Sequence, residues 1–256
     1  MAWNPPNLEK PLRSISAAPS CVLPDVLNNA ATRAQEFADN VPNFTATERI
    51  QYELIDNMFV RMDGQSGDFE YLALFAPMGN GLTVQETRAP LKGTQAFPAS
   101  SQSVGLAELA LIFLPRYRAD FDMACEGRAQ WEGQPAWVVS FLQRADRPNE
   151  MLGVGDANSP QRLTLKGRAW LADSGNVLHL EIGAIRPIPM PKVENWWLSV
   201  KYGPVQFHNQ KIEMWLPQTA DVYILVRQDN SLEAPLYRMM TFQTFANFMM
   251  FSVHVR

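Results

Sequence analysis

The chain has 256 residues, of which 46% are hydrophobic and 19% are charged, and its formal net charge is -4. A chain of this length can bury a substantial core without staples, and its charge balance provides no basic surface for nucleic acid. No apolar run reaches the roughly 18 residues that a membrane-spanning helix needs, since the longest run, residues 106–114, contains Glu108.

The N-terminal residues 1–20 are rich in Pro, Ser and Asn and lack the continuous apolar core of a signal peptide. We therefore expect a flexible lead-in over residues 1–20 and a single domain over residues 21–256. Pro24 and Asp25 can begin a helix. Apolar residues then recur at helical spacing, namely Val26, Leu27, Ala30, Ala34, Phe37 and Ala38. This spacing predicts a helix over residues 24–39.

From Phe44 the hydrophobic period changes to two, which predicts a long strand with one very polar face. Two further strands are expected over residues 69–77 and 82–90, on either side of an Asn-Gly turn. A second, unusually apolar helix is expected over residues 104–114, ended by Pro115.

A series of strands is expected from Tyr117 onward, separated by the turn sequences WEGQ, DSGN, HNQK and RQDN. Helices do not alternate with these strands, so the pattern does not favour a parallel sheet. The sequence predicts an α+β fold in which one large antiparallel sheet carries two helices, both from the first half of the chain.

Residues 165–182 carry the charged and aromatic side chains that most resemble a site. Pairing across the DSGN turn places Ala172 opposite Val177, Leu171 opposite Leu178, Ala169 opposite Leu180, Trp170 opposite His179 and Arg168 opposite Glu181. Opposed side chains of this kind stabilise a hairpin by about 0.2–1 kcal/mol per pair. A metal site would need a third ligand besides His179 and Glu181. We therefore favour a structural hairpin, in which alanine at His179 changes stability by no more than about 1 kcal/mol.

Catalytic signatures such as GxSxG, HExxH, a Walker loop or SxxK do not occur in the sequence. The three histidines, His179, His208 and His254, fall in separate predicted strand regions. We assign Glu48 and the pair Asp120 and Asp122 to solvated sheet faces. The sequence thus favours a protein that is not an enzyme and that has no cofactor or metal. The Met and aromatic residues of the last strands fit either an ordinary core or the lining of an apolar cavity.

An ordered set of stretches supports a family resemblance. They are CVLPDVLNNAATRAQEF, FTATERIQYEL, GRAQWEGQPAWVVSFLQR, LKGRAWLADSGNVLHLEI, VKYGPVQFHNQKIEMWLPQTADVYI and MTFQTFANFMMFSV. Between roughly Cys21 and Val253 the chain resembles secreted, uncharacterised acidobacterial-type proteins related to the outer-membrane lipoprotein-sorting (LolA/LolB-like) superfamily. The resemblance implies an open, strongly curved half-barrel with two helices on its concave face, in a periplasmic or secreted protein.

Two hypotheses about function follow from this resemblance. The first is a non-enzymatic extracytoplasmic binding protein that shelters an apolar ligand, a lipid or a lipoprotein acyl chain, in a concave groove. The alternative is a structural or interaction subunit of an envelope or extracellular assembly, which contacts a protein partner or its own copies and holds no small ligand. Enzymatic activity is the least favoured.

The groove is expected between the sheet and the two helices, residues 24–39 and 104–114, on the side where the apolar half of each strand collects. Its predicted residues are Leu106, Leu109, Ile112, Phe113, Leu165, Leu171 and Leu180. Cys21 and Cys125 fit no metal spacing, and they are expected to form a disulfide if the protein is secreted. Two buried free thiols are the alternative.

Overall fold

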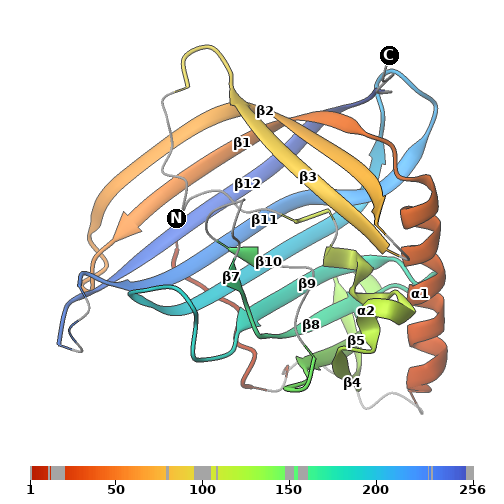
Figure 1. Ribbon diagram of the computed structural model, residues 1–256, viewed down its shortest axis with the longest axis horizontal. Coiled ribbons are helices and arrows are strands. Elements are labelled where there is room, and N and C mark those ends of the chain that lie inside the picture. The colour runs from red at the N-terminus through yellow and green to blue at the C-terminus, as the bar shows by residue number, and fades with distance from the viewer. Residues whose placement is uncertain are drawn as a thin grey trace.

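In the computed structural model the strands form one large antiparallel sheet (Figure 1). The structure describes residues 2–10, 12, 21–78, 81–94, 105–107, 109–147, 153–154, 161–229, 231 and 233–251. The strands of the large sheet are β1 (Phe44–Ile55), β2 (Arg61–Met78), β3 (Gly81–Pro90), β4 (Phe121–Trp131), β5 (Gln134–Gln143), β8 (Leu165–Leu171), β9 (Val177–Ala184), β10 (Val193–Gln206), β11 (Glu213–Arg227) and β12 (Leu236–Met250). Two short strands, β6 (Gly153–Val154) and β7 (Gln161–Arg162), pair with each other.

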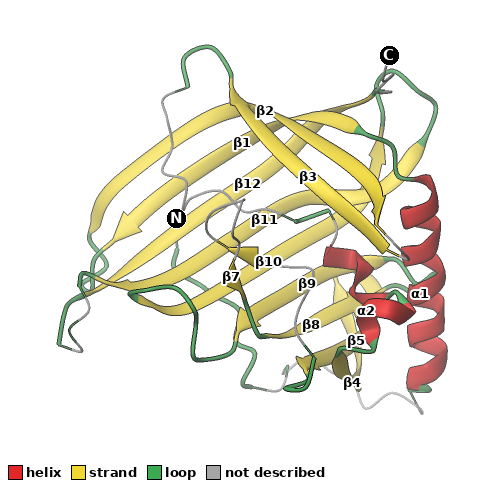
Figure 2. Ribbon diagram, in the orientation of Figure 1, coloured by secondary structure: helices red, strands yellow, loops and turns green. Residues whose placement is uncertain are grey.

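The ten strands of the large sheet have the spatial order β3-β2-β1-β12-β11-β10-β9-β8-β5-β4. From β4 to β12 the chain runs as a meander, and β1 then pairs with β12 on one side and with β2 on the other. The sheet is open, with β3 and β4 at its two edges. Strands predominate and the helices gather at one end of the sheet (Figure 2). The predicted fold class, a curved antiparallel sheet with two helices, is confirmed.

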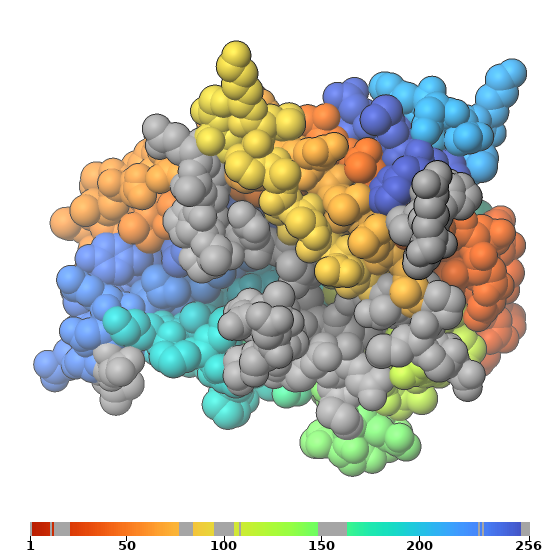
Figure 3. All heavy atoms as spheres, turned by 45° about the horizontal axis from the view of Figure 1, so that its top comes forward, coloured from red at the N-terminus to blue at the C-terminus, as the bar shows by residue number. Residues whose placement is uncertain are grey.

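Helix α1 (Leu23–Asn40) follows the predicted boundaries closely. Pro24 stands in the first turn, where its missing N–H leaves no donor unsatisfied. The buried positions Val26, Leu27, Ala30 and Ala34 form the apolar stripe that faces the sheet. The opposite side of α1 lies at the surface of the molecule, at the right of the space-filling view (Figure 3).

The second predicted helix is wrong in type and in extent. The structure has a 3-10 helix, η2 (Leu109–Phe113), followed by a short α-helix, α2 (Pro115–Arg118). Pro115 therefore begins a helix instead of ending one, which its fixed φ permits at a first position. For the same reason the strand predicted from Tyr117 starts only at Phe121. Val104 and Glu108, which belong to the predicted helix, lie outside the described residues.

The core lies on the side of the sheet that carries α1 and η2, which we call the inner face. Strand residues of this face pack together with both helices in one buried cluster, which includes Ala169, Leu180, Ile182, Leu198, Val200, Ala220 and Val222. Alternate residues of the same strands, such as Arg168 and His179, point to the opposite, outer face.

The hairpin of β8 and β9 confirms most of the predicted register. Arg168 pairs with Glu181, Ala169 with Leu180 and Trp170 with His179. The predicted partners of Leu171 and Ala172 are wrong, because a register shift after Trp170 places Leu171 opposite Val177.

The glycine of the DSGN turn joins this hairpin to α1. Gly175 has φ +88°, and a Cβ there would lie 2.3 Å from the carbonyl oxygen of Asn29. Arg33 Nε also donates to the Ser174 carbonyl oxygen at 3.0 Å. The turn residues are thus explained by the docking of α1.

The described part of the lead-in, residues 2–10, contacts the outer face of the sheet. The Trp3 ring meets Trp197 and Tyr223 edge-on, with ring centroids 6.3 Å and 5.5 Å apart. Glu9 forms an ion pair with Lys166 of β8. The predicted lead-in therefore covers part of the outer face.

Candidate functional site

The predicted groove residues gather in one place. The helix η2 contributes Leu109, Ile112 and Phe113, and Leu106 lies shortly before it. The β8–β9 hairpin contributes Leu165, Leu171 and Leu180. All of them are between 0% and 4% exposed, and all belong to the same buried cluster. These residues therefore belong to one continuous core on the inner face.

The η2 segment acts as a plug over the inner face; we use this name for residues 105–107 and 109–114. Tyr202 Oη of β10 donates to the Leu106 carbonyl oxygen at 2.8 Å, and Leu109 N–H donates to the Gly105 carbonyl oxygen at 3.1 Å. A 3-10 helix this short has poor hydrogen-bond geometry and little stability of its own. The plug is thus held mainly by the burial of its apolar side chains.

An apolar cleft lies beside the plug, between the start of α1, α2 and the start of β4. It has a volume of about 330 Å³ and is lined by Leu23, Pro24, Leu27, Asn28, Arg118, Phe121 and Met123. This volume is at the lower end of the range for small-ligand sites. Leu27 and Phe121 also belong to the buried cluster that contains the predicted groove residues. The cleft therefore adjoins the plug and its core.

The sequence did not indicate the cleft, and its lining includes none of the predicted groove residues. Its walls come from residues 23–28 and 118–123, which are far apart in the chain. The alternation of Phe121 and Met123 with Asp122 was the available signal, because it places two large apolar side chains on one face of β4.

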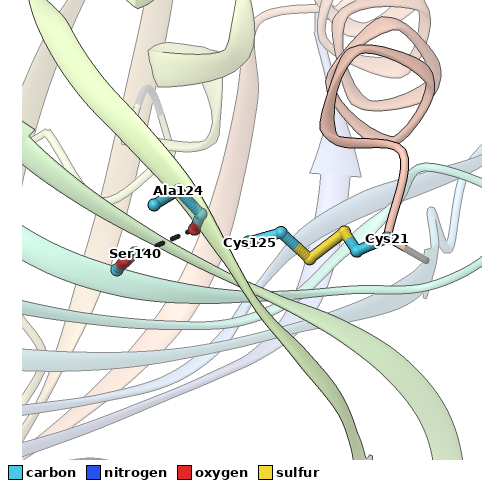
Figure 4. The surroundings of a disulfide bond; sticks show 4 residues. All are labelled: Cys21, Ala124, Cys125 and Ser140. Carbon is cyan, nitrogen blue, oxygen red and sulfur yellow. Dashed lines mark hydrogen bonds between the residues drawn. A yellow bond between two sulfur atoms is a disulfide. The ribbon is translucent and has the colours of Figure 1, made fainter. Parts of the chain in front are cut away.

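The disulfide between Cys21 and Cys125 is confirmed, and its Cα atoms are 6.4 Å apart. Figure 4 shows that it links the chain two residues before α1 to β4. Beside it, Ser140 Oγ of β5 donates to the Ala124 carbonyl oxygen at 3.3 Å. The bridge thus joins the two elements that form opposite walls of the apolar cleft.

A second cleft, of about 360 Å³, is lined by residues of β4, β5 and β8 together with Leu8 of the lead-in. Three of its charged residues, Glu126, Lys166 and Arg168, already form ion pairs. Arg168 Nε lies 2.9 Å from a carboxylate oxygen of Glu126, and Lys166 pairs with Glu9. Arg168 therefore has Glu126, and not its cross-strand neighbour Glu181, as its ionic partner. These internal pairs make the second cleft a poorer candidate for a ligand than the apolar one.

A buried charged cluster on β1, β2 and β3 corrects the sequence interpretation of Glu48. This side chain is completely buried instead of solvated, and it accepts hydrogen bonds from Arg88 Nε at 2.5 Å and Arg88 Nη2 at 3.1 Å. Gln243 Nε2 of β12 donates to the same carboxylate at 2.7 Å. Arg88 also lies over the Tyr71 ring, 5.1 Å from its centroid. Inward-pointing charges on an edge strand such as β3 discourage pairing with other sheets.

Glu86, the third charged member of this cluster, should make stability depend on pH. Burial raises the pKa of its carboxyl above the ordinary 4.5, although the charge of Arg88 opposes the shift. The folded protein then holds this proton more tightly than the unfolded chain does. The contribution of Glu86 to stability is thus complete below about pH 4.5 and falls as the pH rises through the folded-state pKa.

We expect Glu86→Gln to raise the free energy of unfolding relative to the unchanged protein at pH 7, and to have much less effect near pH 4. Urea denaturation at both pH values measures the difference. The exposed Glu70 on β2 provides the control Glu70→Gln. An equal effect of Glu86→Gln at both pH values would contradict the assignment of this pH dependence to Glu86.

The outer face around His179 is also buried. The Trp131 ring stacks on the His179 ring at a centroid distance of 3.8 Å and an angle of 11°. His179 Nε2 is 3.6 Å from Glu181 Oε1, whereas Nδ1 is buried and has no hydrogen-bond partner among the described residues. The nearby Asp221 carboxyl has a pKa raised by burial.

The stacking with Trp131 increases the expected effect of His179→Ala to about 1–2 kcal/mol of lost stability, more than the sequence suggested. The variant His179→Phe should lose less stability than His179→Ala, because phenylalanine keeps a stacked ring and removes the unsatisfied nitrogen. Thermal or urea denaturation of the two variants tests this expectation. Equal losses would show that packing of the ring does not determine the role of this residue.

The residues considered for chemistry do not converge on one site. His208 follows β10 in a turn, His179 lies on the outer face, and His254 is outside the described residues. Within the described ranges, no group of three or more His, Cys, Asp or Glu side chains could hold a metal ion.

None of the helices in the described part of the chain is long and apolar enough to cross a membrane.

Comparison with known proteins gives matches of fold alone. No protein-family model matches the chain, and no curated protein does. A solved structure named as an outer membrane lipoprotein-sorting protein domain from Vibrio parahaemolyticus is 12% identical over 90% of this chain and 94% of its own, with a TM-score of 0.47. A DUF1329 family protein from Desulfovibrio piger is 7% identical over 93% and 96%, with a TM-score of 0.45.

A LolA superfamily protein from Nitrosomonas europaea is 10% identical over 89% of this chain and 94% of its own, with a TM-score of 0.33.

Proposed function

We propose that this protein is a non-enzymatic, extracytoplasmic binding protein that shelters an apolar ligand, a lipid or a lipoprotein acyl chain, at the inner face of its sheet. The observation that carries this proposal is the apolar cleft between α1, α2 and β4. Its lining residues Leu27 and Phe121 are also part of the core that the plug covers. A hydrocarbon chain that enters the cleft thus meets apolar surface that continues towards the plug.

The plug explains how a small cleft could take a longer ligand. Each methylene group that leaves water contributes about 0.8 kcal/mol to binding. If hydrocarbon replaces plug side chains such as Leu109 and Ile112 against β8 and β9, one apolar contact substitutes for another. The exchange then loses little apolar burial, and the weak 3-10 geometry of the plug offers little resistance.

An extracytoplasmic location, periplasmic or secreted, is supported by the disulfide. Cys21 and Cys125 are bonded, and such bonds persist in oxidising compartments and are rare in the cytosol. The disulfide ties together the two segments that form the walls of the cleft, so the same environment that preserves the bond also preserves the shape of the cleft.

Titration of the oxidised protein with a fluorescent fatty acid tests the proposed function. We expect saturable binding that Leu109→Trp abolishes, because a larger ring at this buried position overpacks the plug against the core and leaves no room for hydrocarbon. Ile212→Trp is the control, since Ile212 is an exposed apolar residue far from the plug in sequence. If the unchanged protein does not bind the fatty acid, the carrier function is wrong.

A second candidate function, an interaction subunit, is favoured by one specific surface. The turn between β1 and β2 exposes a contiguous apolar group, Met58, Phe59, Val60 and Met62, at 55–75% of their surface. Exposed apolar patches of this kind often mark contacts with another protein. If fatty acid does not bind, the interaction function remains, and loss of self-association or partner binding on Phe59→Ser would test it.

A further inference from the structure

The apolar cleft contains an isolated basic group. Among the lining residues that the structure describes, Arg118 is the only charged one, and Leu23, Leu27, Phe121 and Met123 provide most of the remaining wall. A guanidinium beside an apolar wall matches a ligand with an anionic end and a hydrocarbon body. The neighbouring Arg116 on the same short helix is exposed and is not part of the lining.

One nitrogen of this guanidinium is unsatisfied. Arg118 Nη1 is buried and has no hydrogen-bond partner among the described residues. Arginine remains charged at any physiological pH and has only donors to offer. Leaving a buried donor of a charged group without an acceptor is unfavourable, so an anionic acceptor that reaches it would gain a charge-assisted hydrogen bond.

We propose that the cleft binds a single-chain fatty acid, with its carboxylate at Arg118 and its hydrocarbon against Leu23, Leu27, Phe121 and Met123. This inference rests on the proposed function and names its ligand class. A carboxylate matches the planar guanidinium because both can form paired, parallel hydrogen bonds. A volume of about 330 Å³ is at the lower end for ligand sites and so favours one slender chain over a lipid with several.

The disulfide gives the site a fixed shape. Cys21 lies two residues before Leu23 on one wall, and Cys125 lies two residues after Met123 on the other. Because residues two apart on a strand share a face, Cys125 and Met123 point to the same side of β4. The bridge therefore holds the start of α1 close to β4 before ligand arrives, and such preorganisation improves affinity by lowering the entropy lost on binding.

Isothermal titration calorimetry of the oxidised, full-length protein with dodecanoate and with dodecanol tests the proposal. The unchanged protein should bind dodecanoate about tenfold to hundredfold more tightly than dodecanol, since a hydrogen bond to a charged group is worth such a factor. Arg118→Gln should remove this preference and leave dodecanol binding within about threefold. The matched control, Arg116→Gln, should keep the preference. Met123→Trp should weaken both ligands by filling the cleft.

The outcomes separate this inference from the proposed function. If dodecanoate binds but Arg118→Gln and Met123→Trp leave its affinity unchanged, the site named here is wrong while an apolar binding function stands. If neither ligand binds the unchanged protein, both are wrong. Thermal denaturation of each variant shows whether it is folded, and if Arg118→Gln is unfolded, the preference of the unchanged protein for dodecanoate over dodecanol decides the matter. Equal affinities of the unchanged protein for dodecanoate and dodecanol would overturn the role of Arg118.

Discussion

Replacing Cys21 and Cys125 together by serine should lower the free energy of unfolding by about 4–5 kcal/mol. The two cysteines are 104 residues apart in the chain, and a cross-link that closes so long a loop removes much conformational entropy from the unfolded state. This is a large part of the total stability of an ordinary domain. Urea denaturation of the oxidised protein and of the double variant measures the difference.

Reduction of the unchanged protein should reproduce the effect of the double serine variant, which separates the loss of the bond from any effect of the serine side chains. Both forms should also bind fatty acid more weakly, since the walls of the apolar cleft are no longer tied. If either change lowers the free energy of unfolding by less than about 1 kcal/mol, α1 and β4 are held together mainly by packing of the core.

Arg88→Met should destabilise the fold by about 3–5 kcal/mol, because it leaves Glu48 as an uncompensated buried charge. The side chains of this pair are only 0% and 3% exposed. The matched control is Arg49→Met on the adjacent position of β1. Arg49 pairs with Asp68 at 3.5 Å, and both of these side chains are about half exposed. Exposed pairs contribute about 0–1 kcal/mol, so the control should change stability little.

A combined variant tests whether unpaired charge is the cause of this loss. Replacing Arg88 by Met, Glu48 by Leu and Glu86 by Gln removes the charges of the cluster together, and apolar replacement of a buried ion pair is often neutral. We expect this variant to be more stable than Arg88→Met alone. If it is no more stable, the loss comes from packing around Tyr71 instead of from electrostatics.

Local sequence patterns predicted most of the fold. The change of hydrophobic period after α1 indicated the strand β1, and the turn sequences marked the hairpins that follow β4. The disulfide was also expected for a secreted protein, since Cys21 lies just before the first helix and can meet Cys125 if that helix packs on the sheet. These features depend on residues close in sequence or on one simple packing rule.

Features that depend on distant contacts could not be predicted in this way. The polar pattern of β1 is the same whether Glu48 faces water or meets Arg88 from an edge strand and Gln243 from the far end of the chain. The apolar run 106–114 has the composition of a helix, yet packing against the sheet gives a plug with a 3-10 helix. The cleft needs two separate segments to meet, so no local pattern contains it.

Binding of an apolar ligand at the inner face underlies both the proposed function and the proposed role of Arg118. Native mass spectrometry of the oxidised protein, prepared without detergent and mixed with an excess of dodecanoate, tests this most directly. We predict a complex with one bound fatty acid that Leu109→Trp or Met123→Trp reduces and Ile212→Trp preserves. A spectrum of the unchanged protein that contains only the ligand-free mass at every fatty acid concentration would contradict the account.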